Sequence, residues 1–237
     1  MGLLCRTWWL KMKILVACEE SQAVTKEFRA LGHEAYSCDL IETSGDNPEW
    51  HIKGDALKEA YSGKYDMMIA HPPCTYLSVS GLHWNKKRPE RAKQTEEALK
   101  FVQKLMDAPV DKIVIENPVS CISTRIKKPS QIVEPWHFGD LATKKTCLWI
   151  KGLDKLTLDI TEKPELEYIS YGKNNRMQKW MYDIRCLDYK SGARAKAASK
   201  TFPGFAKAMA KQWGGTKIVL ENTHKIENSF SLDNETT

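Results

Sequence analysis

Short apolar runs alternate along the chain with segments whose apolar residues recur at helical spacing. The runs are typical of strands buried on both faces of a parallel sheet, and the segments between them are typical of connecting helices. The pattern therefore predicts an α/β fold with a mostly parallel, doubly wound sheet. The predicted strands are residues 13–17 (KILVA), 34–40 (EAYSCDL), 51–56 (HIKGDA), 65–70 (YDMMIA), 111–118 (DKIVIENP) and 146–152 (TCLWIKG).

Three segments are predicted to be helices: residues 23–31, which stop at Gly32, residues 89–106, which begin at a proline, and residues 201–213 (TFPGFAKAMAKQW). We expect a core in residues 12–152, a small variable region in 153–200 and a C-terminal helix in 201–215 that packs on the core. Residues 1–11 are predicted to be an extension outside the fold, and the polar residues 221–237 a disordered tail.

Charge and cysteine usage narrow the class of protein. The formal net charge of +6 favours a polyanionic partner such as nucleic acid. The chain has no apolar run of the roughly 18 residues that a membrane-spanning helix needs, so we expect a soluble protein with no membrane partner. Its seven cysteines are scattered without a C-x-x-C pair. This argues against a metal site of that kind and for reduced thiols in a cytoplasm.

Polar residues that can carry chemistry follow the predicted strands, where ligands bind in a parallel sheet. Asp39 suits the two hydroxyls of a ribose, although an ordinary turn aspartate fits the pattern equally well. Asp55 is placed to accept a hydrogen bond from the amine of an adenine or, alternatively, to cap a helix. The other polar residues at these strand ends are Cys18, Glu19, Glu20, Ser21, Cys74, Glu116 and Asn117.

Cys74 and Glu116 are the sharpest pair among these residues. The prolines at 72 and 73 restrict the backbone beside Cys74, where a thiolate would be an exposed nucleophile, although free cysteines are more often small apolar fillers. Glu116 ends a buried strand, so we expect a raised pKa and a role as proton donor, unless it pairs with a lysine or an arginine. Together they predict a nucleophile and an acid that face one ligand.

The order of the motifs VACEES, CDL, GD, HPPCTYLS and IENP resembles the DNA cytosine-5 methyltransferases, most closely their compact phage-type members. The resemblance extends from about Lys13 to Gly152, and a weaker similarity is present in TFPGFAKAMAKQW. It implies a class I methyltransferase fold, Rossmann-like with a short variable insertion, and S-adenosylmethionine as the cofactor. It also implies DNA as the partner, with the target cytosine flipped out of the duplex, and a bacterial or phage-infected cytoplasm.

The resemblance also implies roles for individual residues. Cys74 would attack C6 of the cytosine while Glu116 contacts N3, and Asn117 would brace the site. Asp39 would bind the cofactor's ribose and Asp55 its adenine. The remaining cofactor-binding residues would be Cys18, Glu19, Glu20, Ser21 and Pro72, and the substrate-binding residues Pro73, Ser78, Lys144, Lys145 and Arg176.

The chain departs from the family pattern at three places. The loop ACEESQ lacks the glycines of the family's Phe-x-Gly-x-Gly turn, which implies a different backbone path. Lys144 and Lys145 stand where the family has a Gln-x-Arg-x-Arg run, and lysine cannot make arginine's planar two-point contact. The recognition region is short, although YGKNNRMQKWMYDIR mixes basic and aromatic residues. Either sequence specificity is low or a partner protein supplies it.

Other functions remain open from the sequence. Methylation of an exocyclic amine needs an Asp/Asn-Pro-Pro-Tyr/Phe loop, and here His71 and Cys74 replace both of its key residues. A non-catalytic DNA-binding protein would explain the glycine-free loop, but it has no need of both Cys74 and Glu116. An enzyme that acts on a free nucleotide would explain the short recognition region.

Overall fold

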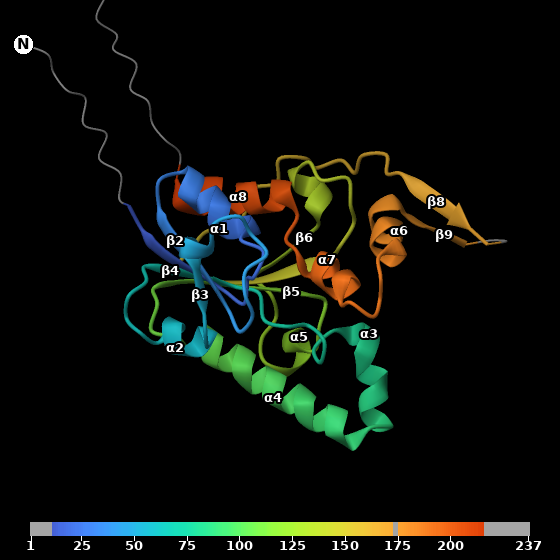
Figure 1. The fold of residues 1–237 in the computed structure, drawn as a ribbon, viewed down its shortest axis with the longest axis horizontal. Coiled ribbons are helices and arrows are strands. Elements are labelled where there is room, and N and C mark those ends of the chain that lie inside the picture. The colour runs from blue at the N-terminus through green and yellow to red at the C-terminus, as the bar shows by residue number, and fades with distance from the viewer. Residues whose placement is uncertain (1–10, 173–174, 216–237) are drawn as a thin grey trace, which may run out of the picture. The chain divides into compact units, whose positions relative to one another are not determined.

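A seven-stranded sheet organises the part of the chain that the computed structural model describes, residues 11–172 and 175–215 (Figure 1). The strand order is β3-β2-β1-β4-β5-β7-β6. The strands are β1 (Lys13–Ala17), β2 (Glu34–Asp39), β3 (His51–Lys53), β4 (Met67–Ala70), β5 (Lys112–Pro118), β6 (Gln131–Val133) and β7 (Thr146–Lys151).

The predicted α/β fold with a mostly parallel sheet is confirmed, with one reversed strand. The pairs β1–β2, β1–β4, β2–β3 and β4–β5 are parallel. Strand β7 runs antiparallel to both β5 and β6. Because of this reversal Thr146, at the start of β7, lies opposite Pro118 at the end of β5. The residues that lead into β7 therefore reach the edge at which the parallel strands end.

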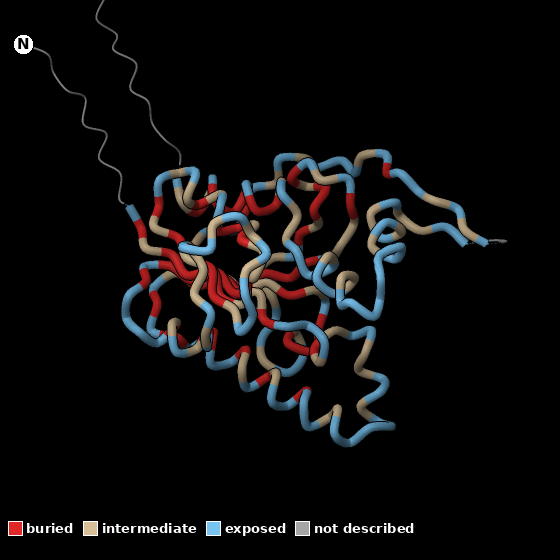
Figure 2. The backbone as a smooth tube through the Cα atoms, viewed as in Figure 1, coloured by how far each residue is buried: buried red, intermediate tan, exposed pale blue. Residues whose placement is uncertain are grey.

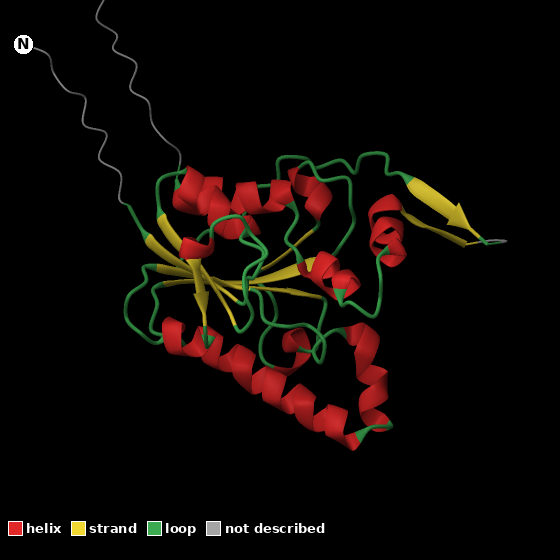
Figure 3. Ribbon diagram, viewed as in Figure 1, coloured by secondary structure: helices red, strands yellow, loops and turns green. Residues whose placement is uncertain are grey.

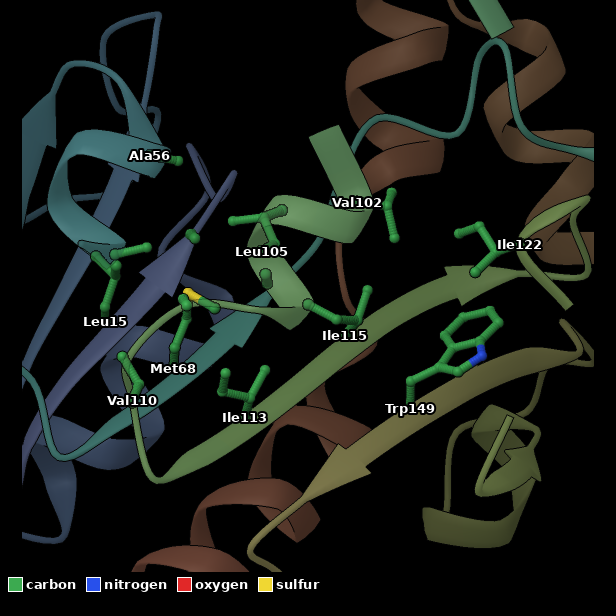
Figure 4. Close-up of a cluster of buried hydrophobic side chains, with 14 of the residues drawn as sticks. Leu15, Ala56, Met68, Val102, Leu105, Val110, Ile113, Ile115, Ile122 and Trp149 are labelled. Atoms are coloured by element: carbon green, nitrogen blue, oxygen red, sulfur yellow. The ribbon is translucent and has the colours of Figure 1, made fainter. Parts of the chain in front are cut away.

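One face of the sheet is covered by α2 (Ala56–Ala60), α4 (Pro89–Met106) and α5 (Ile122–Arg125) (Figures 1 and 3). Alternate strand residues such as Met68, Ile113 and Ile115 pack here against Val102 and Leu105 of α4, and all five are almost completely buried (Figure 4). Continuous apolar strands supply side chains to both faces, since successive residues point in opposite directions.

The opposite face is covered by α1 (Ala23–Ala30) and α8 (Pro203–Gly214), which lie side by side in Figure 1. The intervening strand residues, among them Ile69 and Val114, pack here against Phe28 of α1 and Met209 of α8. Helix α8 begins at a proline in its first turn and buries six of its side chains. Figure 2 shows the buried residues concentrated in the strands and in the helix faces turned toward them.

The variable region forms a hairpin of β8 (Tyr168–Tyr171) and β9 (Asn175–Gln178), followed by α6 (Lys179–Cys186) and α7 (Ala193–Ser199). The hairpin projects away from the seven-stranded sheet (Figure 3). None of the described residues in these four elements is buried. The remaining short helices are α3 (Val79–Leu82) and the 3₁₀ turns η1 (Pro48–Trp50), η2 (His83–Lys86) and η3 (Pro135–Phe138).

The predicted elements agree with the structure except where they are short or exposed. The long helix has the predicted bounds of Pro89–Met106. The third strand ends at Lys53 rather than at residue 56, because Asp55 is the N-cap of α2. Most of the predicted extension, residues 1–10, and all of the predicted tail lie outside the described residues. Among the residues described, no helix is long and apolar enough to span a membrane.

The packing of α4 on the sheet leads to a stability prediction. Leu105 is completely buried between α4 and the strands, so Leu105→Ala should lower the free energy of unfolding by about 2–5 kcal/mol through lost burial and a cavity. Leu141→Ala is the matched control, since Leu141 is 65% exposed and should change stability little. Urea denaturation of both variants measures the difference. Equal stability of the two would contradict this packing.

Candidate functional site

The loop after β1 turns without glycine. Cys18 and Gln22 have φ angles of 59° and 58°, in the left-handed region that favours glycine. The buried Gln22 side chain holds this conformation: its Nε2 donates to the Asn47 carbonyl at 2.6 Å, and its Oε1 accepts from the Asn47 N–H at 3.3 Å. At Gln22, side-chain hydrogen bonds therefore stabilise a backbone conformation that costs a non-glycine residue free energy.

The two glutamates of this loop have different surroundings. The buried Glu19 carboxylate accepts hydrogen bonds from the Val24 N–H at 2.6 Å and from the Thr25 hydroxyl at 2.6 Å, at the N-terminus of α1. It therefore acts as a helix cap. Glu20 accepts from the Ser44 N–H at 3.1 Å, and its Oε1 is buried with no partner among the described residues. The Ser21 hydroxyl accepts from the Ala23 N–H at 3.4 Å.

A cavity of about 580 Å³ lies beyond the carboxyl ends of β1 and β2 and next to α4. Four of the predicted cofactor-binding residues line it, and two of these are the carboxylates Asp39 and Asp55. Each uses one carboxylate oxygen inside the protein: Asp39 accepts from the Ile41 N–H at 3.3 Å, and Asp55 from the Leu57 N–H at 2.8 Å. The other lining residues are Cys18, Leu40, Gly54, Ala56, Pro72, Pro73, Tyr76, Leu77, Gln94, Glu97, Ala98 and Phe101.

The loop that carries Cys74 is held to both neighbouring strands. The buried Asn117 donates from Nδ2 to the Pro72 carbonyl at 2.7 Å, which ties the loop to β5. The His71 N–H donates to the Ala17 carbonyl at 2.9 Å, which ties it to β1. The Cys74 carbonyl accepts from the Leu77 and Ser78 N–H groups, while Cys74 itself stays exposed. The backbone is thus fixed and the residue is accessible.

Glu116 pairs with a histidine. Its Oε2 lies 3.0 Å from His71 Nδ1, and only 15% of the Glu116 side chain and 10% of the His71 side chain are exposed. Burial by itself would raise the pKa of Glu116, but the hydrogen bond and charge of His71, with the charge of Lys144, lower it. Burial would lower the pKa of His71, but Glu116 raises it. The prediction of a raised Glu116 pKa is therefore wrong, because a charged partner outweighs desolvation.

Lys144 reaches the same edge because β7 is reversed. The Lys144 charge favours the Cys74 thiolate, whereas burial and the Glu116 charge disfavour the thiolate. The pKa of Cys74 is raised overall. Lys144 Nζ also donates to the Ala198 carbonyl of α7 at 2.9 Å. The structure thus brings Cys74, Glu116 and Lys144 into one electrostatic environment.

The other predicted substrate-binding residues have different surroundings. Lys145 is exposed beside Lys144. The Ser78 hydroxyl lies 3.1 Å from that of Ser80, at the start of α3. Arg176 lies on β9, with its guanidinium 5.2 Å from the ring centre of Tyr168. These residues are not part of the group formed by Cys74, Glu116 and Lys144.

His71 and Gln22 are the residues that the sequence analysis missed. His71 directly precedes the Pro-Pro-Cys segment at a strand end, so its position was a usable signal. The sequence contained no signal for the role of Gln22, because its hydrogen-bond partner Asn47 lies 25 residues away. Neither a model of a known protein family nor a curated protein matches the sequence. Within residues 11–172 and 175–215, no cluster of His, Cys, Asp and Glu side chains is suited to a metal ion.

The contacts of Glu19 predict that this residue contributes more to the free energy of unfolding than an exposed glutamate does. Glu19→Ala should lower the free energy of unfolding by about 1–3 kcal/mol, because buried N–H donors of α1 lose their charged acceptor. The control is Glu42→Ala, whose 75% exposed side chain pairs with Lys53 at the surface and should contribute little. Thermal unfolding of both variants measures the difference. A Glu19 variant as stable as the control would contradict the capping role.

Proposed function

We propose that the protein is a class I methyltransferase that transfers a methyl group from S-adenosylmethionine to C5 of cytosine in DNA, through a covalent bond between Cys74 and the base. The observation that carries the proposal is the electrostatic grouping of Cys74, Glu116 and Lys144. Cys74 directly follows Pro72 and Pro73, which line the 580 Å³ cavity. A nucleophile next to a ligand cavity, with a carboxyl group in the same electrostatic environment, suits covalent activation of a base.

The sheet supports the cofactor assignment. The order β3-β2-β1-β4-β5 is that of nucleotide-binding α/β proteins, in which ligands bind where the strand order reverses, here between β1 and β4. The cavity lies at this position, and its volume is in the range of small-molecule sites. The added reversed strand β7 agrees with the class I methyltransferase fold that the sequence resemblance implies.

The lining of the cavity fits S-adenosylmethionine. Asp39 and Asp55 offer carboxylates to ribose hydroxyls and an adenine amine, while Leu77 and Phe101 offer apolar surface. No basic residue is among the described residues that line the cavity, which suits a sulfonium cation. Outside this lining, the buried Oε1 of Glu20 has no partner among the described residues and could accept from the cofactor's amino group. When bound, this cofactor supplies an electrophilic methyl group.

Each residue of the group then has a task. The Cys74 thiolate adds to C6 of the cytosine, the π electron pair of the C5=C6 double bond shifts to the C4–C5 bond, and the π pair of C4=N3 moves onto N3. Glu116 bonds to N3, which favours this movement of charge and makes C5 nucleophilic. Lys144 favours the thiolate that starts the reaction. After methyl transfer a base removes the C5 proton, and the Cys74 thiolate leaves.

The variable region supports DNA as the substrate. It contacts the core at the site: Gln178 bonds to Thr143, and Lys196 of α7 lies 3.7 Å from Glu20. Three of its arginines lie over aromatic rings, an arrangement that suits phosphates and stacked bases. These pairs are Arg176 with Tyr168, Arg185 with Tyr171, and Arg194 with Tyr189.

A covalent adduct is the sharpest test of the proposal. A duplex that contains 5-fluorocytosine should form a denaturation-resistant adduct with the protein in the presence of S-adenosylmethionine, because fluorine at C5 blocks the final elimination. Cys74→Ser should abolish both the adduct and methyl transfer. Cys186→Ser is the matched control, since Cys186 is also exposed but lies on α6. Denaturing gel electrophoresis with labelled cofactor measures both.

The alternatives give different outcomes in this experiment. Tight DNA binding without adduct or methyl transfer would indicate a binding protein. Methyl transfer that survives Cys74→Ser would rule out the C5 mechanism and indicate an exocyclic amine. An adduct with a free nucleotide but not with DNA would indicate an enzyme that acts on nucleotides.

The cofactor assignment has its own test. Asp39→Asn removes a charge from the cavity and should raise the Kd for S-adenosylmethionine about 10- to 150-fold, since one charge-assisted hydrogen bond is worth roughly 1.5–3 kcal/mol. Asp46→Asn is the control, because Asp46 is exposed and does not line the cavity. Isothermal titration calorimetry measures both constants. An unchanged Kd in the Asp39 variant would contradict its role.

A further inference from the structure

His71 is a buried titratable residue for which the proposed reaction has no role so far. It follows β4, next to Glu116 on β5. Its Nδ1 lies 3.0 Å from Glu116 Oε2, and its Nε2 is buried without a partner among the described residues. Glu116 is therefore the one acceptor that the described residues offer to a proton on this imidazole.

The pairing raises a problem for the reaction. N3 of the cytosine needs a proton as charge moves into the ring, but the His71 pairing favours the ionised form of Glu116. An ionised carboxylate has no proton to give. The same pairing raises the pKa of His71, so the proton is held on the imidazole. The pair as a whole carries the proton that Glu116 lacks.

We infer that His71 is the proton store of the site: as the Cys74–C6 bond forms, a proton passes from His71 Nδ1 to the Glu116 carboxylate, and Glu116 gives a proton to N3. The pyrimidine ring gains one proton and the electron pair of the thiolate, and His71 becomes neutral. When Cys74 leaves, N3 returns its proton through Glu116 to His71. This inference rests on the proposed function and makes His71 a positioning residue that acts through Glu116.

The charges around His71 fit this role. Glu116 from β5 and Glu19 from the loop after β1 both favour the imidazolium, and Lys144 before β7 opposes it. Glu19 already accepts hydrogen bonds from α1, which leaves Glu116 as the direct partner. A neutral His71 removes a cation from beside Glu116, which makes the return of the proton favourable once the ring is restored.

The test is the pH profile of methyl transfer by His71→Gln. Glutamine can still donate a hydrogen bond to Glu116 but has no proton to release. Because the pKa of His71 is raised, His71 in the wild-type protein stays protonated above the ordinary histidine range. Deprotonation of His71 should therefore limit the wild-type rate only at higher pH. The variant depends on protonation of Glu116 itself, so its rate should fall about 100-fold or more near pH 8 and far less near pH 6.

His83→Gln is the matched control, since His83 is an exposed histidine at the start of η2. It should keep the wild-type rate and profile. An equal loss at both pH values in His71→Gln, with the profile unchanged in shape, would show a merely structural role and overturn the inference while leaving the proposed function intact.

Titration of the histidine ring by NMR tests the proton store without any activity. The His71 signal should titrate at higher pH than an ordinary histidine in the wild-type protein, and Glu116→Gln should move its titration to lower pH. A His71 signal that titrates in or below the ordinary histidine range, or a titration that Glu116→Gln does not shift, would overturn the inference even if methyl transfer occurs. A wild-type protein that forms no adduct and transfers no methyl group would instead refute the proposed function.

Discussion

Parallel pairing of β4 with β5 is the constraint on which the candidate site depends. Ala70 lies opposite Ile115, so the next residues, His71 and Glu116, emerge side by side on the face covered by α1 and α8. Asn117 points to the opposite face and holds the Pro72 carbonyl. A register shift of one residue would send each side chain to the wrong face. One register therefore positions the acid, its charged partner and the loop of Cys74.

The chemistry of the site follows from competition between burial and charge. A carboxyl group as buried as Glu116 would ordinarily favour its neutral form, and an imidazole as buried as His71 would do the same. At a separation of 3.0 Å their mutual attraction outweighs both desolvation costs. The same charges act on the Cys74 thiol: burial and the Glu116 charge raise its pKa, and the Lys144 charge lowers it. The proton therefore has to be assigned to the pair rather than to either residue.

Much of the fold could be predicted because burial leaves a periodic pattern in the sequence. The buried strands β1, β4 and β5 read as apolar runs, and α4 reads as an amphipathic helix that begins at Pro89. Helix α2 and strand β6 escaped prediction because five and three residues are too few to show a period. The hairpin β8–β9 and α6 escaped it because none of their described residues is buried.

The order of the long buried elements could be read from the sequence, because apolar periodicity and chain order are local properties. The same holds for the placement of Asp39, Asp55, Cys74, Glu116 and Asn117 at or near strand ends. How these groups act depends on the three-dimensional arrangement. The reversal of β7 brings Lys144 to the site, and Asn47 supports Gln22 in a turn without glycine. The pairing of strands places His71 against Glu116 and inverts the expected pKa shift, because charge interactions depend on distance in space and not on distance along the chain.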